Sequence, residues 1–254
     1  MIIMRSCQMK KISVTYQFLS LLNWSFIRHK SLILLCSVIQ FFMTIALVYG
    51  YSLIIADDTV QTVYYLASGS VTIGMITIGC TVSAQSISSD KRDGIVSYIQ
   101  TLPVLRSLIL LSDLLIWTLT ALIGVGVSIA VVYLKFQILP QLSLATFLIL
   151  PLVLMTMISM GFAIAYWSTP STMMLVTQLL LMIGLLFSPI MYPAERIPEV
   201  ILRGYHFLPF IPAGDLIRET VYLGHSISVV KLVVLLLWLV ATALLSVNWL
   251  NRQS

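Results

Sequence analysis

Six long apolar runs constrain what this chain can fold into more than any other feature of its sequence. About 20 consecutive apolar residues let an α-helix cross the roughly 30 Å hydrocarbon core of a bilayer. Lipid offers no hydrogen-bond partner to an open backbone, so runs of this kind cross as helices. The sequence therefore predicts an all-α integral membrane protein with six transmembrane helices, at residues 31–56, 62–87, 108–134, 142–167, 172–190 and 227–250.

The composition excludes the main soluble classes. Of 254 residues, 59% are hydrophobic and only 9% are charged, whereas a soluble domain carries about 25% charged residues. This balance rules out a soluble enzyme, a disordered chain and a secreted disulfide scaffold. The cysteines Cys7, Cys36 and Cys80 form no exterior pair, and no Cys/His cluster has metal-ligand spacing, so we expect neither a disulfide framework nor a metal site.

The net charge of +5 reflects membrane topology. Basic residues lie at the ends of the apolar runs, where cytoplasmic segments collect them, and they form no soluble basic face for nucleic acid. With the N-terminus inside, nine of the 14 Lys and Arg residues fall on the cytoplasmic side. We therefore expect a single domain over residues 1–254 in the plasma membrane, with both termini cytoplasmic. The nine are Arg5, Lys10, Lys11, Arg28, Lys30, Lys91, Arg92, Arg106 and Arg252.

Residues 12–28 precede the first span and have an amphipathic pattern. Tyr16, Leu19, Leu22 and Phe26 share one arc of a helical wheel. Such a helix would lie on the inner membrane face. The alternative is a simple N-terminal extension of the first span.

The cytoplasmic loop between spans two and three, residues 88–107, breaks the apolar pattern. It opens with four charged residues from Asp90 to Asp93, followed by Gly94 as a turn residue. A short amphipathic helix then follows and Pro103 stops it; its apolar face consists of Ile95, Ile99 and Leu102. This helix would either insert into a groove on another protein or lie on lipid as a connector.

The exterior segment between spans five and six, residues 191–226, is apolar yet broken by proline. Together with Pro189, its prolines make up five of the nine in the chain. Such a stretch cannot span as one helix, and we interpret it as short re-entrant or interfacial helices in the outer leaflet. A plain extracytoplasmic cap is the alternative.

Two features inside the spans indicate helix packing. Span two contains Gly69, Gly74 and Gly79 among Ser and Thr residues, and small residues let helices approach closely. Asp113 near the start of span three is interpreted as an interfacial acid, neutralised by Arg106 two turns earlier.

Two motifs carry a resemblance to a known family. The run from Asp90 through Gly94 to Thr101-Leu102-Pro103-Val104-Leu105-Arg106 resembles the coupling region of type-2 ATP-binding-cassette (ABC) exporter permeases. The run Ser188-Pro189-Ile190-Met191-Tyr192-Pro193, with Pro198, Leu208-Pro209, Pro212 and Arg218 after it, is similar to that family's exterior re-entrant region. The six-span order and the amphipathic leader also match. The chain departs from the family in having Asp at 90 and 93, where Glu is more frequent, and Leu208-Pro209 in place of Asn-Pro.

The resemblance implies a permease subunit that moves an amphipathic substrate, such as a drug, peptide or lipid-linked molecule. It would pair with a second permease copy or a sister permease and with two ATP-binding subunits. No phosphate-binding G-x-x-x-x-G-K-[ST] motif occurs, so ATP and Mg would bind to the partner subunit. The residues implied for coupling to that subunit are Asp90, Arg92, Asp93, Gly94, Ile95, Tyr98, Ile99, Leu102, Pro103 and Arg106. Those implied for the exterior segment are Pro189, Tyr192, Pro193, Pro198, Pro209, Pro212 and Arg218.

Two other function classes agree less well with the sequence. A secondary, ion-coupled transporter or channel would usually place ionisable residues near the middle of the membrane, and the predicted spans carry none there. An intramembrane protease would need a G-x-S motif with a histidine at similar depth. The nearest sequence, Ala67-Ser68-Gly69, lacks the leading glycine, and the histidines lie outside the predicted spans.

Overall fold

The computed structural model describes residues 14–54, 60–141, 143–186, 190–191, 208–224 and 227–252. This part of the chain forms helices and connecting turns without a strand, which confirms the all-α prediction. The helices are α1 (Val14–Ile54), α2 (Val60–Ile76), η1 (Thr77–Val82), α3 (Ser83–Arg92), α4 (Ile95–Thr101), α5 (Arg106–Phe136), α6 (Leu144–Trp167), α7 (Pro170–Leu186), α9 (Phe210–Ile217), η3 (Arg218–Leu223) and α10 (Val229–Arg252).

Five helical stretches among the described residues are long and apolar enough to cross a bilayer. They are Val14–Leu53, Val60–Arg92, Arg106–Phe136, Leu144–Trp167 and Val229–Arg252. The predicted span 172–190 corresponds to α7, which has 17 residues and is shorter than the roughly 20 residues that a crossing needs. The prediction of a multi-pass helical membrane protein is therefore confirmed, and the count of six spans stays a prediction.

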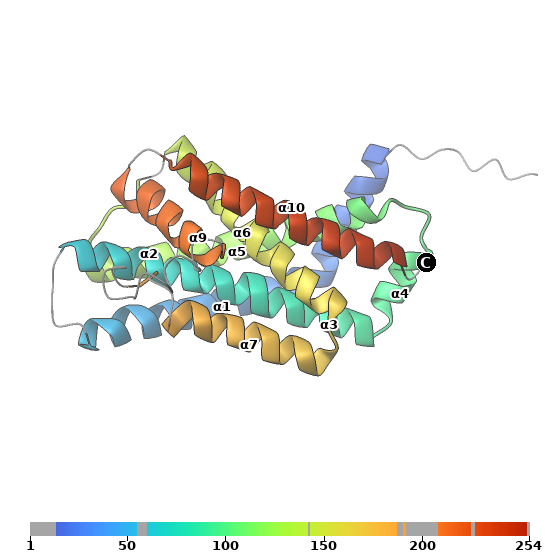
Figure 1. The fold of residues 1–254 in the computed structure, drawn as a ribbon, viewed down its shortest axis with the longest axis horizontal. Coiled ribbons are helices and arrows are strands. Elements are labelled where there is room, and N and C mark those ends of the chain that lie inside the picture. Colours follow the sequence, from blue (N-terminus) through green and yellow to red (C-terminus); the bar gives the residue numbers. More distant parts are fainter. Residues whose placement is uncertain are drawn as a thin grey trace, which may run out of the picture.

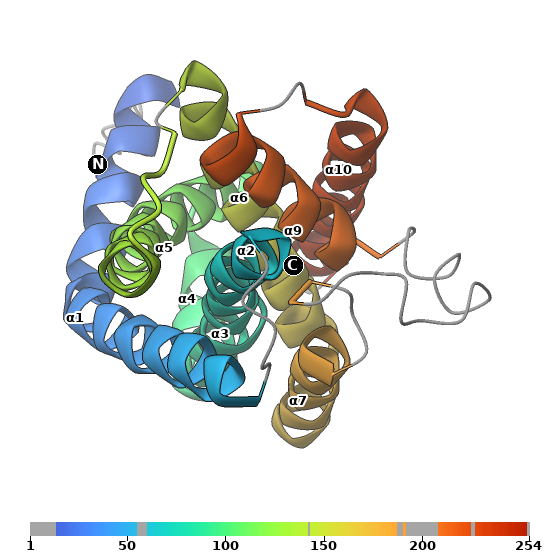
Figure 2. The same ribbon diagram turned by 90° about the vertical axis from the view of Figure 1, so that its left-hand side faces the viewer.

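The long helices run side by side along the longest axis of the molecule (Figure 1). Viewed along that axis, α2 lies near the middle, with the other long helices around it (Figure 2). One end of the bundle carries α4, the start of α1 and the end of α10, and we call it the α4 end. The opposite end carries α9 and the start of α2, and we call it the α9 end (Figure 1).

Glycines allow the central helix to pack closely, as its small residues predicted. A Cβ atom at Gly79 of η1 would lie 2.5 Å from the Cβ of Met157, and one at Gly161 of α6 would collide with the Gly79 carbonyl oxygen. The helix widens to a π-helical turn at η1, where it contacts α6. The predicted packing role of these glycines is confirmed, because no larger residue fits between the two backbones.

The amphipathic leader and the first predicted span form one continuous helix, α1. Its first part lies across the bundle axis and the rest runs along it (Figure 1). Leu21, Ser25 and His29 of the first part are buried, while Tyr16 and Phe26 are exposed. The apolar arc therefore faces outward, and a neighbouring face packs on the protein. The continuity of α1 agrees with the alternative of an extended first span, and an interfacial position stays a prediction.

Candidate functional site

The segment predicted to couple to an ATP-binding subunit, residues 88–107, lies at the α4 end. Its first residues are helical, which differs from the predicted loop. The helix of span two continues through α3 to Arg92, so Asp90, Lys91 and Arg92 are helical and do not lie in a loop. The chain turns at Asp93 and Gly94, where Gly94 has a left-handed φ of +74°. Glycine adopts that conformation without steric cost, which lets α4 begin directly after the turn.

The apolar face of α4 packs on its own chain. Ile99 is only 4% exposed and forms a small cluster with Leu21 of α1 and Ile109 of α5. Ile95 and Leu102 are half-buried. The expectation that these three residues face a partner protein differs from this arrangement, because Ile99 already has its apolar neighbours within the chain. Tyr98, which is 61% exposed, lies on the outer face of α4.

Arg106 holds the end of α4 in place. Its guanidinium donates hydrogen bonds to the carbonyl oxygens of Ile99 (3.1 Å), Leu102 (3.3 Å) and Gln100. The last carbonyls of a helix have no partner within the helix, so this side chain acts as a cap. Pro103 follows in the exposed connection to α5.

Asp113 has other partners than the predicted Arg106. It accepts a hydrogen bond of 2.9 Å from Arg28 Nη2 and one of 2.6 Å from Ser25 Oγ, both on α1. Arg28 Nη1 also lies 3.5 Å from Asp90 Oδ2 on α3. The predicted pair is therefore wrong: Arg106 reaches toward α4, and Arg28 joins α1 to α3 and α5.

Lys91 fixes α3 to a different part of the bundle. Its Nζ donates to the carbonyl oxygens of Ala165 (3.0 Å), Tyr166 (3.0 Å) and Ser168 (3.2 Å) at the end of α6. It also lies 4.8 Å from the ring centre of Trp249 in α10. A cation at a helix C-terminus is favoured by the helix dipole, so the segment that leads into α4 is bonded to α6.

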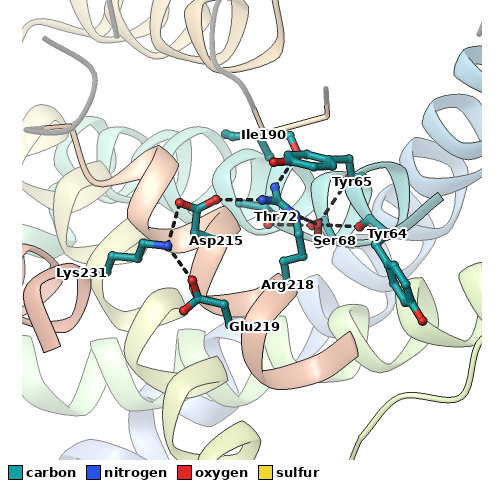
Figure 3. Close-up of polar contacts among 9 residues, drawn as sticks. All are labelled: Tyr64, Tyr65, Ser68, Thr72, Ile190, Asp215, Arg218, Glu219 and Lys231. Carbon is teal, nitrogen blue, oxygen red and sulfur yellow. Dashed lines mark hydrogen bonds and ion pairs between the residues drawn. The ribbon is translucent and has the colours of Figure 1, made fainter. Parts of the chain in front are cut away.

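The α9 end contains a second group of charged residues, which we call the outer cluster: Asp215, Arg218, Glu219 and Lys231 (Figure 3). Lys231 of α10 lies between the two acids, 2.9 Å from Asp215 Oδ2 and 2.6 Å from Glu219 Oε1. Arg218 Nη1 lies 2.9 Å from Asp215 Oδ1. Two cations thus neutralise two carboxylates, and the cluster ties α9 and η3 to α10.

Arg218 also fixes this region to the central helix. Its Nε donates to Ser68 Oγ of α2 at 3.2 Å and its Nη2 to the Ile190 carbonyl oxygen at 3.3 Å. The guanidinium stacks 3.6 Å above the ring of Tyr65 (Figure 3). A cavity of about 610 Å³ beside the cluster is bordered by the start of α2, by η3 and by Lys231.

The structure places only part of the predicted exterior residues. Arg218 lies in the outer cluster, Pro209 immediately precedes α9, and Pro212 lies within its first turn. A short helix in this segment was expected, and re-entry into the leaflet stays a prediction. The other predicted residues, Pro189, Tyr192, Pro193 and Pro198, lie outside the described residues.

Sequence reasoning missed the structural roles of Arg28, Lys91 and Lys231, which it treated as topology signals. The i, i+3, i+4 spacing of Asp215, Arg218 and Glu219 was an available signal of one charged helix face. Among the described residues, no group of three or more His, Cys, Asp or Glu side chains could hold a metal ion.

Comparison with known proteins gives one match. A family model described as ABC-2 type transporter matches residues 16–222. This range includes the leader, the coupling region and the outer-cluster residues Asp215, Arg218 and Glu219. A search of curated proteins found no match.

Proposed function

We propose, because the chain belongs to the ABC-2 type transporter family, that it is the permease subunit of an ATP-driven exporter in a plasma membrane. The family identifies a transport subunit that spans the membrane. The proposal adds export of an amphipathic cargo, cytoplasmic termini, and a second permease copy or sister permease. It also adds two ATP-binding subunits, which would bind ATP and Mg²⁺.

The observation that carries the proposal is the fixed position of α4. A short helix at the end of a bundle transmits motion only if it is attached to the helices that must move. Arg106 attaches α4 to α5, the Ile99 cluster attaches it to α1, and Lys91 attaches the preceding turn to α6. A push on α4 would therefore reach several spans at once.

The exposed face of α4 is the surface that we assign to the ATP-binding subunit. It comprises Arg92 and Asp93 before the helix and Ser97, Tyr98 and Thr101 on it, all exposed. A cavity of about 400 Å³ next to α4, bordered by Ser97, Thr169 and Trp249, extends this surface. Aromatic residues such as Tyr98 are enriched among the residues that dominate protein interfaces.

The preference for a cargo with an apolar portion is supported by a groove between α6, α7 and α10. It has a volume of about 420 Å³, and its walls include Met160, Leu180, Trp238 and Leu245. Apolar and flexible side chains such as Met adapt to ligands of varied shape. The outer cluster would keep the α9 end closed at rest, because its ion pairs join η3 to α10.

The test is affinity purification of the tagged full-length chain from its native host in mild detergent. We expect recovery of an ATPase with the Walker A phosphate loop, and loss of that ATPase from the Tyr98→Glu variant. Lys30→Gln is the matched control, since Lys30 is an exposed cation of α1 and is not part of the assigned surface. Recovery of the chain without any ATPase would contradict the proposal and favour an ion-coupled carrier.

A further inference from the structure

A cavity of about 420 Å³ lies between α1 and the last turns of α3, near the α4 end. One part of its wall is apolar and the other is polar, as a membrane amphiphile requires. It reaches the surface, because Leu35, Gln85 and Arg92 on its wall are exposed. The apolar lining residues are Leu32, Leu35 and Val82, and the polar ones are Arg28, His29, Ser31, Gln85, Ser86, Ser89, Asp90 and Arg92.

Two buried polar atoms of the lining residues, Arg28 Nε and His29 Nε2, lack a hydrogen-bond partner. A third, Asp90 Oδ2, accepts no hydrogen bond and forms only the ion pair of 3.5 Å with Arg28 Nη1. Buried polar groups normally have a partner in the protein or in a bound molecule. Arg28 Nε is a donor and Asp90 Oδ2 is an acceptor. His29 is 2% exposed, and its Nδ1 lies 2.9 Å from the Ser25 carbonyl oxygen. A carbonyl oxygen only accepts, so Nδ1 holds the proton and Nε2 of the neutral ring is an acceptor.

The charges around the cavity are balanced. Arg28 contacts Asp90 and Asp113, and Arg92 adds a second cation at the cavity mouth. Asp113 is not a lining residue, but its ion pair with Arg28 offsets the second cation. These two cations and two anions sum to zero, so the site gives no net attraction to an anionic or a cationic ligand. A ligand with one anionic and one cationic group, and with no net charge, would leave this balance intact.

We propose that this cavity binds the headgroup of a zwitterionic aminophospholipid, with its acyl chain along Leu32, Leu35 and Val82. The phosphate is expected to accept from Arg28 Nε and Arg92. The primary ammonium is expected to donate to Asp90 Oδ2 and His29 Nε2. This site is separate from the proposed cargo groove and depends only on residence in a membrane, although it shares Arg92 with the surface proposed for the ATP-binding subunit. Asp90 lies at the end of α3, so a bound lipid would contact the segment that positions α4.

The test is native mass spectrometry of the full chain after incubation with an equimolar mixture of phosphatidylethanolamine, phosphatidylcholine and phosphatidylglycerol with identical acyl chains. We expect about tenfold preference for phosphatidylethanolamine over phosphatidylcholine, because only the former can donate N–H bonds to the two acceptors. Asp90→Asn should reduce this preference to about one, and Arg92→Gln should lower retention of all three lipids. Lys30→Gln, an exposed cation that does not line the cavity, should change neither.

Ser86→Phe would fill the cavity without removing a charge. This variant tests the same proposal if Asp90→Asn fails to fold. We expect this variant to lose the preference while its thermal unfolding stays close to that of the wild type. Equal retention of phosphatidylethanolamine and phosphatidylcholine by the wild type would overturn the proposal, as would a preference that survives Ser86→Phe. Displacement of the lipid by equimolar glycerophosphoethanolamine would overturn the lipid assignment in favour of a soluble phosphoamine.

Discussion

Neighbouring residues of α4 should respond to substitution in opposite ways. Ile99 is buried in the cluster with Leu21 and Ile109, whereas Tyr98 is largely exposed. Ile99→Ala should therefore destabilise the protein, and Tyr98→Ala should weaken only the attachment of the ATP-binding subunit. Together the two variants distinguish a residue that holds α4 in place from a residue that contacts the ATP-binding subunit.

The magnitude follows from burial. Ile99→Ala removes three carbon atoms from a site that is 4% exposed. Each buried methylene is worth about 0.8 kcal/mol, and the cavity left behind raises the total to roughly 2–4 kcal/mol. At about 2–4 °C per kcal/mol for a chain of this size, the Tm should fall by roughly 4–16 °C. Tyr98→Ala should change the free energy of unfolding by about 0.5 kcal/mol or less.

The assay follows thermal unfolding by intrinsic fluorescence, for which the chain offers five tryptophans. The ratio of co-purified ATP-binding subunit to permease is measured in parallel. We expect a lowered Tm only for Ile99→Ala, and a lowered subunit ratio at intact Tm for Tyr98→Ala. A Tm loss from Tyr98→Ala equal to that from Ile99→Ala would refute the assignment of the two faces. So would an unchanged Tm in Ile99→Ala.

Three further predictions concern the bundle and the outer cluster. Gly161→Val should lower the yield of monodisperse protein by several-fold in size-exclusion chromatography, since any Cβ there collides with the Gly79 carbonyl oxygen. A Cβ atom at Gly126 would meet no neighbouring atom, and alanine favours the helix more than glycine does. Gly126→Ala should therefore raise the free energy of unfolding by about 0.5–1 kcal/mol. Arg218→Gln should lower the Tm and expose the outer cluster, measured as faster labelling of a cysteine introduced at the half-buried Tyr64 by a membrane-impermeant maleimide. Labelling at the wild-type rate would contradict the role of Arg218 in closing the α9 end.

The helices and much of their packing were predictable because their causes are local. An apolar run in lipid must satisfy its own backbone, so its helical form depends on the run itself. The same holds for the turn at Gly94 and for close packing at Gly79. For α7 the described helix covers Pro170–Leu186, and the full predicted span of residues 172–190 stays a prediction.

The sequence by itself determined the membrane class, the helical content and the family resemblance. The tertiary structure decided which charged residues meet and which face of α4 is free. Arg28 and Asp113 are 85 positions apart, and Lys91 and Ala165 are 74 apart. Helix packing decides which carboxylate or carbonyl group lies within reach of a long cationic side chain. The spacing of residues in the sequence does not predict these partners. Ile99 turned inward for the same reason, because Leu21 from a distant helix supplied its apolar neighbour.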